Sequence, residues 1–589
     1  MVDMKARPFY LSDDDIAWVN STIAGMSDEE KVGQLFFQLT ASQDEEYLKE
    51  LMQKYHVGGC RYNGMVGAKV QEQNHILQSY AKVPIFLACN TEAGANGACD
   101  DGAPIGSGVK IGATDNTDYA YALGKMSNEV ASVIGCNMAF APVCDIAYNW
   151  ENTEIITRAF GNDPERVARM SAAYVQGAHA IPGFSCAAKH FPGNGQDFRD
   201  AHMANNVNYF DLEKWDATYG LVYKTLIDND LDAIMAGHIM APKIARAFNP
   251  DLTDEEMMPA TLSPELMKGL LREHLGFNGM IVTDASHMIA MTDRMTRKEM
   301  LPTCINAGCD MFLFFNDPDE DFETMLAAYK DGTISEERMT EALTRILALK
   351  AHLGLHKKTV DELVPSKEAV AATLAKPEYK AMHEAISRDS ITLVKYKDKD
   401  VLPISPERYK RIMIVYVKGQ ENWMSSIMKM MGMPAKMTPA EKLKERLIAK
   451  GFEAFIYESP LDKIKKQLEA GERPSLNIYF AGKNSIADFT KDMDLVITLC
   501  DVSSGRPQFG FSKGGGEVPW YVFELPVIAI GCGQPTMLAD IPQVRTYINT
   551  YDSADDTLDA LIDDLLTGPE AFKGVDPIDS YCGLFDAKI

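Results

Sequence analysis

The sequence of 589 residues has no long hydrophobic run and no closely spaced pair of cysteines. No stretch approaches the ~18 consecutive apolar residues of a membrane-spanning helix. The opening residues, MVDMKARPFYLSDDD, lack the apolar segment of a secretion signal. The eleven cysteines are scattered singly, without a C-x-x-C pair, which is typical of free thiols in a reducing compartment rather than of a disulfide framework. We therefore expect no membrane association and a cytoplasmic location.

Positive charge is also scarce. The chain has 58 basic residues (Lys and Arg) against 84 acidic ones (Asp and Glu), a formal net charge of −26. This balance argues against a nucleic-acid or anionic-membrane partner, because phosphates attract basic surfaces. Hydrophobic residues make up 46% and charged residues 24%, so the composition is that of a globular protein with a large core and excludes a disordered chain. It leaves the oligomeric state open.

Short apolar runs recur between residues 30 and 355. Near-continuous apolar runs are typical of parallel strands buried on both faces. The segments between them, such as 263–276 and 335–355, have amphipathic helical spacing, and in the first Ser263 and Gly276 are placed to begin and end a helix. Eight strand-then-helix units predict an α/β fold with a TIM-type (β/α)8 barrel. The runs are 33–38, 57–62, 84–90, 137–145, 183–190, 232–238, 279–284 and 310–316.

The pattern changes after Leu355. Residues 356–389 are charged and helical, contain Pro365 and Pro377, and are expected to connect two domains. Apolar runs at 411–417, 451–457, 494–500 and 525–531, with helical segments between them, predict a smaller three-layer α/β sandwich. We thus predict a barrel domain over 1–355, a linker over 356–389 and a C-terminal sandwich over 390–589. The glycine-rich segment 503–520 is expected to be a surface loop, with a lid over the barrel mouth as the alternative.

Polar residues follow the predicted barrel strands. Active sites of such barrels lie at the carboxyl ends of the strands, where all eight ends meet at one rim. Any one of these residues could merely cap a turn, but six of them together favour a functional site. They are Asn90, Asp145, Lys189, His190, His238 and Asp284.

A long loop after the fifth predicted strand carries Asp200 and His202 two residues apart. In an extended segment such residues share a face. A carboxylate beside an imidazole fixes its tautomer and stabilises its protonated form, so His202 could donate and accept a proton near neutral pH. Isolated D-x-H pairs are common, however, and a solvated loop is the alternative. Asp284 ends a buried strand and could be a nucleophile, a base, a metal ligand or a cap.

Together these segments resemble glycoside hydrolase family 3, and in particular its bacterial β-N-acetylglucosaminidase branch. The family pattern K-H-F-P-G-H-G, four residues, then D-S-H is matched by KHFPGNG-QDFR-DAH, and the nucleophile motif by GFNGMIVTD. The resemblance covers residues 30–355 and continues more weakly into the C-terminal domain. Further matches are FAPVCDI (140–146), TRAFGNDPE (157–165), AIMAGHI (233–239) and INAGCDMFL (305–313).

The resemblance implies a retaining double displacement on a terminal β-linked N-acetylglucosamine of a glycan, chitin or cell-wall fragment. Asp284 would attack the anomeric carbon. His202, held by Asp200, would protonate the departing oxygen and later activate water. No metal and no organic cofactor is expected. By position in the motifs, the residues that would bind the sugar hydroxyls are Asn90, Arg158, Lys189 and His190.

The sequence departs from the family pattern at four points. Asn90 stands where the motif D-x-E-G-G has its aspartate, and the arginine that usually follows that motif has no counterpart in residues 95–102. Asn194 replaces the second histidine of K-H-F-P-G-H-G, and Ala201 replaces the serine of D-S-H. Because Asp284, Asp200 and His202 are all present, these departures bear on the identity of the sugar more than on the reaction.

Three alternatives remain open. The first is another specificity of the same family, such as β-glucosidase activity or transfer to phosphate, which a neutral imidazole repels less than a carboxylate does. The second is a non-catalytic sugar-binding protein. The third is a metal-dependent barrel hydrolase. Its zinc ligands would be His190, His202, His238 and Asp284. The sequence has no H-x-H motif on a predicted strand to support it.

Overall fold

The computed structural model describes residues 2–419, 437–458, 460–473, 486–502 and 518–589. The chain forms two compact units, which are described separately. The first comprises Met1–Gly108 and Asn116–Met382, and the second comprises Val109–Asp115 and His383–Ile589. Most of the glycine-rich segment predicted as a surface loop or lid, namely 503–517, lies outside the described residues.

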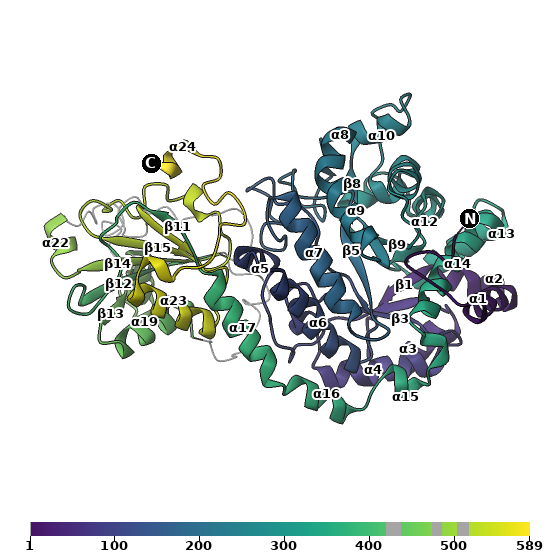
Figure 1. Cartoon of the computed structure of the whole chain (residues 1–589), viewed down its shortest axis with the longest axis horizontal. Helices are drawn as coiled ribbons and strands as arrows, with labels where there is room; N and C mark the ends of the chain where they lie inside the picture. Colours follow the sequence, from purple (N-terminus) through teal and green to yellow (C-terminus); the bar gives the residue numbers. More distant parts are fainter. Residues whose placement is uncertain (1, 420–436, 459, 474–485, 503–517) are drawn as a thin grey trace. The chain divides into compact units, whose positions relative to one another are not determined.

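The first unit is a closed barrel of eight parallel strands in the order β1-β10-β9-β7-β5-β4-β3-β2 (Figure 1). Each predicted apolar run coincides with one strand, so the predicted TIM-type barrel is confirmed. A two-stranded sheet of β6 (Asn206–Val207) and β8 (Ile239–Met240) was not predicted. The barrel strands are β1 (Phe36–Leu39), β2 (Gly59–Arg61), β3 (Phe86–Cys89), β4 (Met138–Ala139), β5 (Ser185–Phe191), β7 (Ala233–Ala236), β9 (Met280–Ala285) and β10 (Met311–Leu313).

Amphipathic helices surround the barrel (Figure 1). The segment predicted as a helix over 263–276 is a π-helix over Glu265–His274; the Ser263 hydroxyl accepts a hydrogen bond from the backbone of Leu266, and Gly276 follows with φ +70°. The longer helices are α1 (Asp13–Gly25), α2 (Asp28–Gln34), α3 (Glu45–Gln53), α4 (Gly67–Tyr80), α6 (Thr117–Val133), α7 (Pro164–His179), α9 (Leu221–Asp228), α12 (Arg297–Ala307), α13 (Pro318–Lys330) and α14 (Glu336–His352).

A buried carboxylate fixes the strand that carries Asp284. Asp310, just before β10, is fully buried and accepts hydrogen bonds from Arg272 and Arg338, both at 2.8 Å, and from the backbone of Ile281 in β9 at 3.0 Å. Burial alone would raise the pKa of Asp310, but the surrounding arginine charges hold it below its usual value. This network ties β9 to β10 and to the helices outside them.

The predicted linker, 356–389, is folded into helices. They are α15 (Val360–Leu363), α16 (Lys367–Leu374) and most of α17 (Pro377–Ser390). The first two pack against helices of the barrel unit, α15 on α4 and α16 on α4 and α6. The domain limits at residues 355 and 390 stay our proposal.

The second unit contains a six-stranded sheet in the order β11-β16-β15-β14-β12-β13, in which only the edge strand β11 is antiparallel. Side chains alternate between two apolar cores: Ile412 and Ile414 face the core that includes helices α19 (Pro439–Ala449) and α23 (Asp555–Thr567), whereas Met413 and Val415 face the other. The predicted α/β sandwich is confirmed. Its strands are β11 (Thr392–Tyr396), β12 (Arg411–Lys418), β13 (Glu453–Ile456), β14 (Leu495–Asp501), β15 (Val527–Gly531) and β16 (Thr546–Asn549).

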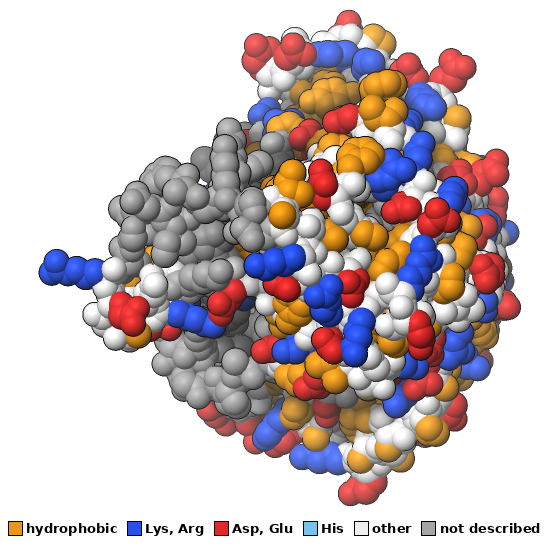
Figure 2. Space-filling model, turned by 90° about the vertical axis from the view of Figure 1, so that its left-hand side faces the viewer, with side chains coloured by type: hydrophobic (Ala, Val, Ile, Leu, Met, Phe, Trp, Pro, Cys, Tyr) orange, Lys and Arg blue, Asp and Glu red, His pale blue; other side chains and the backbone are white. Residues whose placement is uncertain are grey.

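Within the described residues, no helix is both long and apolar enough to cross a membrane. All eleven cysteines are buried free thiols. On the described surface visible in Figure 2, acidic and basic side chains are interspersed rather than gathered into regions of one sign.

Candidate active site

Asp284 lies at the carboxyl end of β9, with its side chain mostly buried. One carboxylate oxygen accepts a hydrogen bond from the backbone of Ala285 at 2.7 Å, and another lies 3.9 Å from Nε2 of His190. Burial alone would raise the pKa of Asp284, but the imidazoles of His190 and His238 outweigh it and hold the pKa below its usual value. The carboxylate is therefore ionised at neutral pH, as a nucleophile must be.

His190 is held in one orientation by Asp145. Nδ1 of His190 lies 2.7 Å from an Asp145 oxygen, and the same carboxylate accepts hydrogen bonds from the backbone of His190 at 3.2 Å and of Asn194 at 2.7 Å. Because the carboxylate accepts, Nδ1 carries the proton and Nε2 faces Asp284. Both side chains are buried.

Arg158 and Lys189 meet on one carboxylate, that of Glu92. The guanidinium of Arg158 donates to both Glu92 oxygens at 2.8 and 2.9 Å, and Nζ of Lys189 lies 2.5 Å from one of them. Burial would raise the pKa of Glu92, but the two cations hold it far below its usual value. Sequence reasoning missed Glu92, although it lies two residues after Asn90 in the motif NTEAG.

Asp200 and His202 form the predicted pair. Oδ1 of Asp200 lies 2.7 Å from Nδ1 of His202 and also accepts from its backbone at 2.8 Å. The hydrogen bond that His202 donates to Asp200 is the main cause that raises the pKa of His202, and the charges of Glu154 and Asp284 add to it. The loop is tied to the segment after β9 by backbone hydrogen bonds, one of them from Ile289 to the carbonyl of His202 at 3.4 Å. The pair therefore shares an electrostatic environment with Asp284.

Glu154 was not predicted and lies beside this pair. One ligand atom from each of Glu154, Asp200 and His202 lies within 4.8 Å of the others. The amide of Asn194 donates to Glu154 at 3.0 Å, and Arg158 lies 3.5 Å from it. Asn194, where the family pattern has histidine, thus positions a second carboxylate near His202. Glu154 stands in a polar loop without a motif, so the sequence carried no signal for it.

The zinc ligands of the third alternative are not brought together. Among the described residues, the group that could hold a metal ion is Glu154, Asp200 and His202, which shares only one member with the predicted set. His238 is engaged elsewhere: its ring nitrogens lie 2.9 Å from the Thr261 hydroxyl and 3.0 Å from the Ala285 carbonyl.

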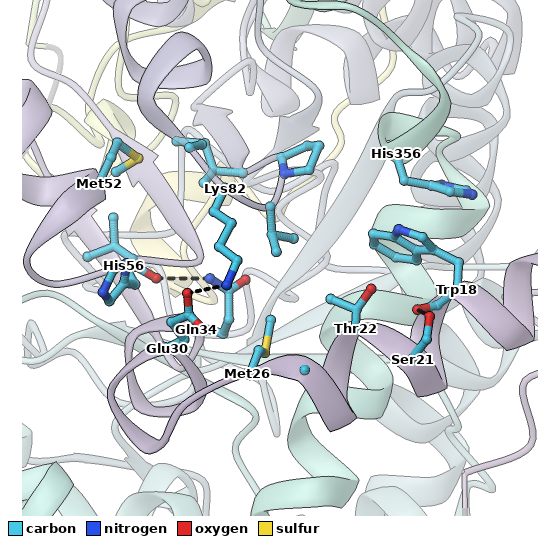
Figure 3. A pocket seen from close by; sticks show the side chains of 16 residues that line it. Trp18, Ser21, Thr22, Met26, Glu30, Gln34, Met52, His56, Lys82 and His356 are labelled. Atoms are coloured by element: carbon cyan, nitrogen blue, oxygen red, sulfur yellow. Dashed lines mark hydrogen bonds and ion pairs between the residues drawn. The ribbon is translucent and has the colours of Figure 1, made fainter.

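A separate pocket of about 340 Å³ lies at the opposite end of the barrel (Figure 3). Its lining includes Trp18 and Gln34 and the segment that precedes β3, so it borders the amino ends of the strands. An ion pair of 2.6 Å joins Lys82 to Glu30 within it. None of the predicted site residues lines this pocket, and enzymes of this fold react at the other end.

Comparison with known proteins agrees with this geometry. The Glycosyl hydrolase family 3 N terminal domain matches residues 27–349. A β-N-acetylglucosaminidase/β-glucosidase of Cellulomonas fimi is 38% identical over 594 residues, covering 100% of both chains. β-Hexosaminidase A of Pseudoalteromonas piscicida is 29% identical over 386 residues, covering 61% of this chain and 62% of that protein.

Two solved structures share the fold. That of the β-glucoside phosphorylase BglX covers 99% of both chains with a TM-score of 0.87 and 34% identity. That of a family 3 β-N-acetylglucosaminidase from Paenibacillus sp. str. FPU-7 covers 94% of this chain and 99% of that one, with a TM-score of 0.75 and 23% identity. The chain therefore belongs to glycosyl hydrolase family 3 and is a glycoside hydrolase built on the predicted barrel and sandwich.

Proposed function

We propose that the protein is a retaining exo-glycosidase that removes terminal β-linked N-acetylglucosamine from glycans or cell-wall fragments. The observation that carries the proposal is the ionised Asp284 at the end of β9 in the same electrostatic environment as the Asp200–His202 pair. The relatives named β-N-acetylglucosaminidase and β-hexosaminidase support this sugar.

The reaction would have two steps. In the first step, a carboxylate oxygen of Asp284 attacks the anomeric carbon, and the bond from this carbon to the glycosidic oxygen breaks. Nε2 of protonated His202 donates its proton to the departing glycosidic oxygen. In the second, the neutral imidazole of His202 takes a proton from water as the water oxygen attacks the same carbon, which frees the Asp284 carboxylate. The raised pKa of His202 favours the protonated form needed for the first step.

Four side chains would bind the sugar hydroxyls. Lys189 and Arg158 are charged donors whose positions are fixed by the shared carboxylate of Glu92. His190 faces Asp284, and Asn90 stands at the end of β3 with an amide that can donate and accept. The rigid arrangement would place the anomeric carbon against Asp284.

Replacement of Asp284 by alanine tests the proposal. With an aryl β-N-acetylglucosaminide, Asp284→Ala should lose at least about 10³-fold in kcat, because the covalent step has no nucleophile. Azide, a small external nucleophile, should restore part of the activity. Asp14→Ala, which changes an exposed carboxylate in α1, is the control. Unchanged turnover of Asp284→Ala would refute the assignment.

A second candidate is transfer to phosphate, which the full-length match to the β-glucoside phosphorylase BglX favours. Here phosphate would replace water in the second step, and the uncharged His202 would repel it less than a carboxylate would. Two measurements distinguish hydrolysis from phosphorolysis. One is the rate of cleavage of an aryl glycoside with and without inorganic phosphate, and the other is detection of a sugar 1-phosphate. A phosphate-independent rate with free sugar as the product supports hydrolysis.

We also propose a cytoplasmic location and a carbohydrate as the partner. Eleven buried free cysteines fit a reducing compartment. Cell fractionation tests the location, and recovery of the protein with secreted material would contradict it.

A further inference from the structure

Arg61, the last residue of β2, points into the barrel. The ring of Phe37 in β1 lies 5.2 Å from that of Phe140, which follows β4. Two strands, β2 and β3, separate β1 from β4 around the wall, so this contact runs through the interior. Phe37 is in register with Gly59, and side chains two residues apart on a strand share a face. Arg61 therefore faces inward at the carboxyl end, where active sites of barrels lie.

The charge of Arg61 belongs to the same environment as the candidate nucleophile. Burial lowers the pKa of Arg61, and the negative charges of Glu92 and Asp284 oppose that shift. Neither carboxylate is paired with it: Glu92 is shared between Arg158 and Lys189, and Asp284 faces Nε2 of His190 at 3.9 Å.

The guanidinium of Arg61 has no hydrogen bond or ion pair with any residue that the structure describes. It carries five N–H donors on a partly buried side chain. Because the side chain is only partly buried and its nitrogens are unpaired, its N–H groups are available to the acceptor atoms of a ligand. The Asn90 amide likewise has no partner among the described residues.

These two unpaired groups come from neighbouring strands at the same end of the barrel. Arg61 is in register with Ala88 of the neighbouring strand β3, and Asn90 follows two residues later. An aspartate at position 90, as in the family pattern, would offer Arg61 a counter-charge, whereas the amide of Asn90 does not. The chain also lacks the arginine that usually follows this motif, since residues 95–102 contain none.

We propose that Arg61 binds hydroxyl oxygens of the terminal sugar, supplying from β2 the guanidinium that the chain lacks after β3. The inference rests on the proposed function, in which the barrel mouth holds the sugar attached to Asp284. The ligand class is a neutral pyranoside, because the forked N–H groups of arginine match two neighbouring oxygens. Arg61 is thus a specificity-determining residue of the sugar site.

Substitution of Arg61 combined with deoxy sugars tests this. We expect Arg61→Met to lower kcat/KM about tenfold to a hundredfold on the aryl glycoside of the preferred sugar. On the two monodeoxy analogues that each lack one of the two bound hydroxyls, Arg61→Met should cost less than on the parent sugar, because part of the contact is already gone, and on the other deoxy analogues it should cost as much as on the parent sugar. Arg61→Lys, which keeps the charge, should recover part of the loss and serves if the methionine variant does not fold.

Lys82→Met is the matched control, because it removes a cation from the other end of the barrel (Figure 3) and should leave kcat/KM unchanged. A fluorinated sugar that labels Asp284 in the unchanged enzyme establishes the proposed function independently. If that label forms, an Arg61→Met activity within about threefold of the unchanged enzyme, or an equal loss on every deoxy analogue, overturns the role of Arg61. If the label does not form, the proposed function itself fails.

Discussion

Replacing Asp200 with asparagine should lower the fraction of His202 that is protonated at neutral pH and move the pH dependence of turnover. Asparagine keeps the shape of the side chain but removes the charge that lies 2.7 Å from Nδ1 of His202. The first step needs protonated His202, so kcat/KM falls as the pH rises through the pKa of this group in the folded enzyme. Because Asp200 is the main cause that raises this pKa, its removal should move the fall to lower pH.

The size of the effect of Asp200→Asn depends on how far the two side chains are exposed to solvent. The side chains of His202 and Asp200 are 53% and 35% exposed, so water and salt screen their attraction, and we expect a loss of about 1 kcal/mol in the free energy that favours the imidazolium. General acid catalysis contributes about 10²- to 10⁴-fold. The imidazole ring of His202 also loses its fixed orientation. Asp200→Asn should therefore lower kcat/KM about tenfold to a hundredfold on an alkyl glycoside, whose alcohol is a poor leaving group.

The assay compares two leaving groups between about pH 5 and 9, the range in which histidine titrates. A 2,4-dinitrophenolate departs without a proton, so the dinitrophenyl glycoside should lose less than about threefold and serves as an internal control for folding and binding. An equal loss on both substrates, together with an unmoved alkaline limb, would refute the pairing of Asp200 with His202 as the acid.

Glu92→Gln should destabilise the fold by about 3–5 kcal/mol at pH 7, because it leaves the buried Lys189 without its counter-charge and Arg158 with only the carboxylate of Glu154. The pKa of Glu92 is lowered in the folded state. The difference in the free energy of unfolding between the unchanged enzyme and Glu92→Gln should therefore shrink as the pH falls below the ordinary carboxyl pKa of about 4.3. Urea unfolding at pH 7 and pH 4 measures this difference. Asp310→Asn should cost about 3–5 kcal/mol in urea unfolding, whereas Asp331→Asn, at an exposed carboxylate, should leave the urea midpoint nearly unchanged. Glu154→Gln should also move the alkaline limb of kcat/KM to lower pH, because the Glu154 charge adds to the raised pKa of His202; an unmoved limb would contradict this.

The barrel was predictable because its strands are buried on both faces, so the sequence of each strand is a nearly uninterrupted run of apolar residues. The lengths of the strands could not be predicted as well. The run over 137–145 yields only Met138–Ala139 as β4, with Pro142, which has no N–H to donate, in the following segment.

Two neighbouring strands of the second sheet, the edge strand β11 and the internal strand β16, were not predicted, whereas the other edge strand, β13, was. β11 (Thr392–Tyr396) pairs with one neighbour only, antiparallel to β16, and contains Lys395 within a half-buried run. Such a strand lacks the continuous apolar signature of a buried parallel strand, so local pattern alone does not reveal it.

The candidate site divides in the same way. The Asp200–His202 pair is local, two residues apart, and could be read from the chain. The ion pair between Glu92 and Arg158 joins residues 66 positions apart, so only the folded barrel shows it. Arg61 lay within the predicted strand 57–62, but its inward direction depended on the register with β1.

Mass spectrometry of the enzyme after reaction with a 2-deoxy-2-fluoro or 5-fluoro β-glycoside shows whether Asp284 is the nucleophile. We expect one covalently bound sugar per chain, attached to the peptide 279–288 at Asp284, and loss of activity in step with labelling. Attachment at any other carboxylate, or full inactivation without a label on Asp284, would contradict it.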